Sequence, residues 1–141
     1  MSWEAALRWR LLNAPAVLAL TGTHPDDGLP SIEWGNLRQG AERPAIVLKL
    51  VSDTRPVTHD GFDSIRSSRV RASIQAETRA DVIALREAAI AALAPAGRFG
   101  ATGAQVWFDR TGFELLRDIG APTETGFVHA DSVDLIVTHK G

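Results

Sequence analysis

The chain contains no cysteine, and this absence removes several kinds of site at once. Without cysteine there is no disulfide, no thiolate nucleophile and no cysteine-based zinc site. A basic excess is missing as well, because 15 lysines and arginines stand against 17 acidic residues, for a net charge of −2. Proteins that bind duplex nucleic acid usually carry a clear basic excess, so the composition disfavours that class.

Long apolar runs are also missing, and no stretch is long enough to cross a bilayer. The first residues form an amphipathic pattern around Trp3 and Arg8 and lack the apolar core of a signal peptide. We therefore expect no membrane partner and synthesis in the cytoplasm. The chain has 141 residues, of which 45% are hydrophobic and 23% charged, and this predicts one globular domain over residues 1–141.

The most informative stretch is "SSRVRASIQAETRADVIAL", residues 67–85, because its period changes halfway. Polar and apolar residues alternate from Arg69 to Glu77, which predicts a strand with one dry face and one wet face. At Thr78 a capping-box-like pattern begins and the spacing becomes helical. The apolar face of this helix is predicted to hold Val82, Leu85, Ala89 and Leu93.

Other patterns complete a predicted fold. A helix is expected from Ser2, with Trp3, Leu7 and Leu11 on one stripe, and a short helical segment is expected from Pro15. Strands are expected at 31–37, 45–53, 104–116 and 126–140. We predict an α+β fold in the order α-β-β-β-α-β-β. Its mostly antiparallel sheet has four to five strands, with two main helices packed on one face.

Motifs for chemistry are weak throughout. His24 and His59 have aspartates nearby, but both lie in turn sequences, and no histidine pair has metal-ligand spacing. The glycines of residues 97–103 follow a helix and precede a strand, which is the reverse of the order in phosphate-binding loops. We therefore expect no catalytic residue, no cofactor and no metal.

Polar residues without a catalytic pattern suggest contacts with other molecules. The wet face of the predicted strand carries Arg69, Arg71, Gln75 and Glu77, which fit either cross-strand ion pairs or a protein–protein contact. Residues 53–68 hold too little apolar area to offset the cost of ordering them, so a partner surface could order them. The expected anchor there is Phe62, within a polar rim of Arg55, Asp60, Asp63 and Arg66.

Two other functions stay open at this point. A small hydrolase-like enzyme could use His59 with Asp60 or Asp63 as the acid–base group. A nucleic-acid-binding module could use Arg66, Arg69 and Arg71, and its binding would then weaken with salt.

Several segments together resemble a known family. A leading helix "EAALRWRLLNAPAVLALTG" precedes Pro44–Val47, a strand from Arg69 to Ala76 runs into the next helix, and the last strand follows Thr125-Gly126-Phe127. In order and spacing these resemble the tail-completion proteins of long-tailed bacteriophages, the family DUF3168, which is related to phage tail terminators. The resemblance covers nearly the whole chain.

The resemblance implies a structural role. Members are similar in role to a ring of six copies that caps the tail tube, stops its polymerisation and offers a surface to the head connector or stopper protein. Gene transfer agents, which are phage-like particles, carry equivalent parts. The implied partners are therefore further copies of this chain, the tail tube protein and the head–tail connector, and DNA passes through the ring without specific binding. The implied location is the tail of a virion or gene transfer agent particle, at the head–tail junction.

Overall fold

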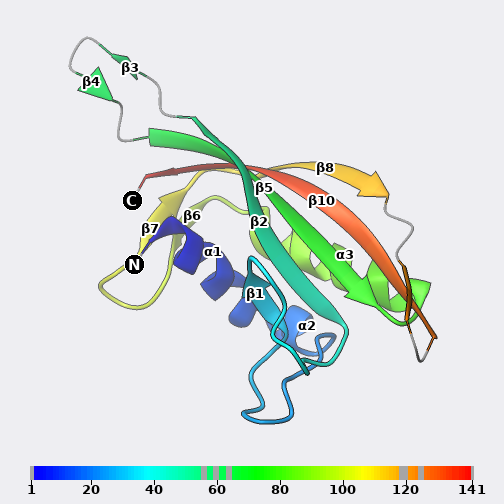
Figure 1. Ribbon diagram of the computed structural model, residues 1–141. Coiled ribbons are helices and arrows are strands. Elements are labelled where there is room, and N and C mark those ends of the chain that lie inside the picture. The colour runs from blue at the N-terminus through cyan, green and yellow to red at the C-terminus, as the bar shows by residue number, and fades with distance from the viewer. Residues whose placement is uncertain are drawn as a thin grey trace.

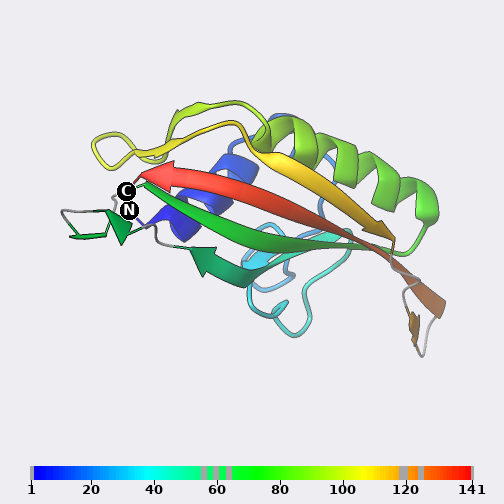
Figure 2. The ribbon, with the colours of Figure 1, turned by 90° about the horizontal axis from the view of Figure 1, so that it is seen from above.

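The computed structural model describes residues 2–54, 57–58, 61–62, 65–117, 121–123 and 126–140. A long curved sheet lies over a layer of helices, all of which cover the same face (Figure 1). The central strand is β10 (Gly126–Lys140), which pairs with β5 (Ile65–Ala76) along one edge. Figure 2 shows the long strands side by side from above.

The other strands complete the sheet on both sides of this central pair. β2 (Ala45–Thr54) pairs with β5, and the short β1 (Ile32–Trp34) pairs with β2 in parallel. The other edge of β10 is shared by β7 (Val106–Phe108) and β8 (Gly112–Arg117), and β6 (Gly97–Phe99) pairs with β7. β9 (Ala121–Thr123) pairs with the start of β10, while β3 (Val57–Thr58) and β4 (Gly61–Phe62) pair with each other.

The prediction of a mixed, mostly antiparallel fold with helices on one face is confirmed, but the strand count was too low. The expected strand 104–116 divides into β7 and β8 because residues 109–111 lie opposite only residues 137–138 of β10. Three residues thus face two, and the one without a partner turns the side chains that follow it to the opposite face, as in a β-bulge. β6 lies within the glycine-containing stretch 97–103, for which no strand was predicted, and the parallel pairing of β1 was not predicted either.

The helices begin where the sequence indicated. In α1 (Trp3–Leu12) the Ser2 hydroxyl accepts a hydrogen bond from the Ala5 backbone N–H at 3.1 Å. Pro15 is the first residue of α2 (Pro15–Leu18). Thr78 caps α3 (Arg79–Leu93) by accepting from the Asp81 N–H at 3.2 Å. The predicted apolar face of α3 is confirmed, since Val82, Leu85, Ala89 and Leu93 are all buried.

The core lies between the helices and the inner face of the sheet, which is the face turned toward them. It is built from α1, α2, α3 and alternate residues of β2, β5 and β10, among them Leu7, Ile46, Ile74, Leu85 and Leu135. Burial of these side chains is the main stabilising contribution to the fold. In the described part of the chain, no helix has the length and apolar character needed to cross a membrane.

A second irregularity lies in β2, where the pairing with β5 shifts between Leu50 and Ser52. Val51 is the extra residue in β2, and it turns the side chains of the residues after it to the opposite face of the sheet. Asp53 therefore pairs with Ser68, whose side chain lies on the inner face, although the alternation before the bulge would have placed Asp53 outside. The sequence had indicated that β2 ends at Asp53 and that the polar segment 53–68 follows it. Instead, β2 continues to Thr54 and β5 begins at Ile65.

Candidate functional site

The face of the sheet turned away from the helices, called here the outer face, carries a cluster of four charged side chains. Arg69 Nε donates to one carboxylate oxygen of Asp134 at 2.8 Å, and Arg71 Nε donates to the other at 2.8 Å. Arg69 also binds Glu114 of β8 through its Nη2. Asp134 is fully buried beneath the two guanidinium groups. The cluster thus joins β5, β10 and β8 across the outer face.

These contacts neutralise the charges of the two arginines. The hydrogen bond from Arg71 lowers the pKa of Asp134, and the bond from Arg69 adds to this effect against the opposing effect of burial. The same contacts raise the pKa of both arginines. Two cations and two carboxylates cancel, so Arg69 and Arg71 form cross-strand ion pairs and do not present a cationic patch.

The remaining predicted interaction residues are not brought together. Arg66 lies at the other end of β5, where it donates to Asp53 at 2.7 Å. Gln75 donates to the neighbouring Ser73 hydroxyl at 3.4 Å, and Glu77 is exposed just beyond the end of β5. Arg55, Asp60 and Asp63, with His59 of the hydrolase hypothesis, lie outside the described residues. Of Phe62 only the backbone is described, as part of β4.

A buried chain of polar groups lies beside Arg66 on the inner face. The Ser68 hydroxyl contacts Asp53 Oδ1 at 2.9 Å and His139 Nε2 at 3.0 Å, and the His139 ring stacks on Trp3 at 4.4 Å. The residue types match a serine-hydrolase triad, but here the serine stands between the acid and the histidine. Ser68 is only 1% exposed, so its hydroxyl cannot reach a substrate. Burial lowers the pKa of His139.

A second buried carboxylate ties α3 to the sheet. Asp131 of β10 accepts two hydrogen bonds from Arg79, at 2.7 and 2.9 Å, and one from Arg86 at 2.7 Å. Burial alone would raise the pKa of Asp131, but the two arginines outweigh it and hold the pKa below the usual value. Neither Asp131 nor Asp134 was predicted from the sequence to be a site residue. Acidic residues are rare inside strands, so "HADSVDLIV" could have indicated that both have arginine partners.

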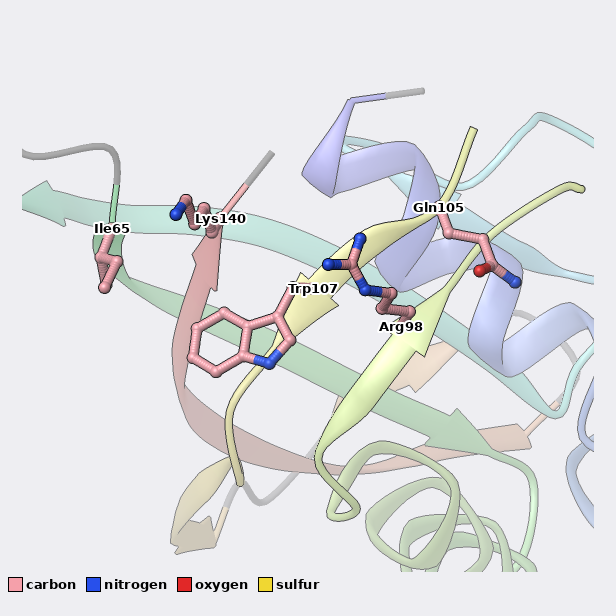
Figure 3. A pocket seen from close by; sticks show the side chains of 5 residues that line it. All are labelled: Ile65, Arg98, Gln105, Trp107 and Lys140. Atoms are coloured by element: carbon pink, nitrogen blue, oxygen red, sulfur yellow. The ribbon is translucent and has the colours of Figure 1, made fainter. Parts of the chain in front are cut away.

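The C-terminal end of β10 holds a row of side chains that was likewise not predicted from the sequence. Arg98, Trp107, Lys140 and Ile65 are cross-strand neighbours on β6, β7, β10 and β5, and with Gln105 they line a depression of about 480 Å³ (Figure 3). This set of four is called the cationic row. Neither Arg98 nor Lys140 has a hydrogen bond or ion pair in the described part of the chain. Their charges are thus available to another molecule.

An apolar groove lies at the edge of the molecule between α1, β1 and β2. It has a volume of about 660 Å³, and its lining includes Trp9, Leu12, Trp34 and Leu50. The Trp34 indole N–H donates to the Glu4 carbonyl oxygen at 2.9 Å, which fixes that ring in place. Trp9, which lies off the buried stripe of α1, lines this groove and is partly exposed.

Metal-ligand geometry is not found in the described ranges, where no group of three or more histidines and acids could hold an ion. His24 was expected in a solvated turn, but it is buried. Its ring accepts from the Asp26 N–H at 3.1 Å and contacts the Gln39 carbonyl oxygen at 2.9 Å, so it organises the loop before β2.

Comparison with known proteins gives one informative likeness. No family model and no curated protein matches this chain, so membership of DUF3168 stays a prediction. The fold is similar to that of a chain in the solved structure titled "Virion of native gene transfer agent (GTA) particle". The TM-score is 0.56 at 15% identity, and the match covers 99% of this chain and 96% of the other. The two chains therefore share a fold over almost their whole length.

Proposed function

We propose that this chain is a structural protein of a phage-like particle. In this proposal it forms a ring of six copies that caps the tail tube, ends its polymerisation and joins it to the head connector. The observation that carries the proposal is the full-length likeness to a chain of a gene transfer agent virion, with neither chain leaving a large part unmatched. The family resemblance of the sequence points to the same kind of particle independently.

The site geometry is consistent with this proposal. The buried carboxylates Asp134 and Asp131 are engaged in ion pairs between structural elements, and the serine of the triad-like set is buried. The arginines of the nucleic-acid hypothesis are each bound to a carboxylate, so they offer little net charge to a phosphate backbone. A ring through which DNA passes without being bound needs a surface with little net positive charge.

Tube polymerisation in vitro tests the proposal. The tail tube protein of the same particle is allowed to polymerise with and without the purified chain, and tube lengths are measured by electron microscopy. We expect shorter tubes with additional density at one end when the chain is present from the start. Addition after polymerisation serves as the control, since it should add density without changing the lengths. Unchanged tube lengths and bare tube ends would contradict the proposal.

Deletion of the gene in the intact particle supplies a second readout. We expect heads and tails that fail to join, with tails of irregular length. Particles that assemble normally without this chain would exclude the proposed role.

A further inference from the structure

The two ends of the sheet carry opposite charges that have no partner within the described chain. We propose that the cationic row of one copy binds Glu77 and Asp81 of the next copy, so that subunits associate head to tail. This inference rests on the proposed function, because it names the contact between neighbouring subunits of the ring.

The cationic end is built by four strands. Arg98 and Lys140 flank Trp107 on either side, each one strand away, so their backbones stand roughly 10 Å apart. All three side chains lie on the outer face, since Val106 and Phe108 on either side of Trp107 are buried in the core. Farther along the same face, Arg69 and Arg71 are bound to carboxylates. The row is thus a cationic region at one end of a face on which Arg69 and Arg71 are neutralised, while exposed Lys49 beside Arg71 keeps its charge.

The acidic end lies where β5 passes into α3. Glu77 follows the last residue of β5, and Asp81 lies in the first turn of α3. Both residues are exposed, and neither side chain forms an ion pair or hydrogen bond in the described part of the chain. Their carboxylates are therefore available to the two cations of another copy.

Distance prevents the two charged ends of one copy from meeting. Ile65, a member of the cationic row, begins β5, and Glu77 follows its other end. A strand of 12 residues spans about 40 Å. Figure 1 shows the start of α3 and the β6–β7 pair at opposite ends of the molecule. The complementary charges can neutralise each other only between copies.

A second copy fits the row better than nucleic acid does. Two cations release few counterions, and the chain as a whole carries a net charge of −2, so attraction to a phosphate backbone is weak. A contact between two different patches of the same chain is heterologous, and it generates a ring when the rotation between neighbours closes. Charge complementarity of this kind sets register and partner choice more than affinity.

Cysteine cross-linking tests the contact directly, because the natural chain has no cysteine to interfere. Gln105→Cys places a thiol beside the row, and Ala80→Cys places one between Glu77 and Asp81; both positions are exposed. The two single-cysteine proteins are mixed at high concentration and low salt and then oxidised. We expect a disulfide-linked dimer of the two. The matched control is Ala91→Cys, exposed on the same helix about 16 Å farther along, which should give little product.

Charge reversal makes the test specific to the proposed pairs. In the Gln105→Cys protein, Arg98→Glu with Lys140→Glu should lower the dimer yield about fivefold, the effect of two exposed ion pairs of ordinary strength. When this charge-reversed protein is mixed with an Ala80→Cys protein that carries Glu77→Lys and Asp81→Lys, the dimer yield should be restored. All four side chains are exposed, so folding should be unaffected and is checked by circular dichroism.

The possible results separate the contact from the proposed function. Equal yields for Ala80→Cys and Ala91→Cys, or no restoration by the paired reversals, would refute the contact. The contact would also be refuted if no cross-link forms and the chain instead binds DNA in a way that Arg98→Glu abolishes. If the reversed row leaves tail assembly intact, the contact is wrong while the function stands. If cross-links form but the chain leaves tube length unchanged, the function is wrong while the contact stands.

Discussion

At the scale of single residues, two buried carboxylates of β10 hold neighbouring elements together. Asp131 faces α3 and binds Arg79 and Arg86, whereas Asp134 faces outward and binds Arg69 and Arg71. Each acid has two arginines, so neither carboxylate is left uncompensated. Both pKa values lie below 3.8, so the stabilisation from these pairs is present above that pH and is lost as the pH falls through the folded-state values.

Replacing Asp131 tests the strength of this arrangement. Asp131→Asn should lower the free energy of unfolding by about 2 kcal/mol, because two arginines lose their charged partner. Chemical denaturation measures the change. The control is Asp109→Asn, since Asp109 is exposed and, among the described residues, its side chain accepts only the Arg110 backbone N–H, which an asparagine oxygen can also accept. Equal stability of the two variants would contradict the prediction.

His139 provides a prediction about pH. Its pKa is lowered below 6.5 because burial penalises the imidazolium. The unfolded chain then binds the proton more readily than the folded one, so His139 destabilises the fold as the pH falls below about 6.5. We expect the ring protons of His139 to titrate below that value in NMR spectra. A titration midpoint above 6.5 would show that the Ser68–Asp53 contact dominates over burial.

At the scale of elements, the bulge in β2 accommodates Val51 as one extra residue between Leu50 and Ser52. Deleting Val51 should remove the bulge while Ser52 still pairs with Arg69 and Asp53 with Ser68, so Asp53 should keep its inner position and its contacts with Ser68 and Arg66. We therefore expect the free energy of unfolding, measured by chemical denaturation, to change by about 1 kcal/mol or less.

A double-mutant comparison isolates this effect. Asp53→Asn should destabilise the natural chain and the Val51 deletion by similar amounts, because the contact with Ser68 is kept in both. Val51→Thr is the control, as it keeps the extra residue and changes only an exposed side chain. A much smaller effect of Asp53→Asn in the deletion variant would contradict the prediction, since it would mean that Asp53 loses its partners when the bulge is removed.

The separation of interacting residues along the chain explains which features of the helices and strands could be predicted from the sequence. α3 was predicted with its cap and its buried face because Thr78 and the apolar spacing act within a few residues. The partners of Arg71 and Arg69 lie 63 and 65 residues away on β10, so strand alternation alone could place the arginines on a face but could not identify Asp134. The two bulges were missed because each is defined by the partner strand and not by its own residues.

At the scale of the whole molecule, the exposed large apolar side chains are spread over many elements. They include Leu18, Leu29, Leu50, Ile83 and Leu115. Obligate oligomers usually bury a large continuous apolar interface. We therefore expect the purified chain to be a monomer in dilute solution, and the ring of the proposed function should close only when tube subunits are present. Light scattering that shows a stable hexamer at nanomolar concentration would contradict this.

The position of β10 in the chain has a consequence for biosynthesis. Its partners β5, β7, β8 and β9 all precede it in the chain. The backbone edges that pair with β10 therefore stay unpaired until residues 126–140 have emerged from the ribosome. A nascent chain lacking that segment cannot close its core, because Val133, Leu135 and Val137 have not yet been supplied. An interrupted translation product therefore cannot fold into a partial subunit. If the chain has the proposed function, only copies synthesised through β10 could take part in assembly.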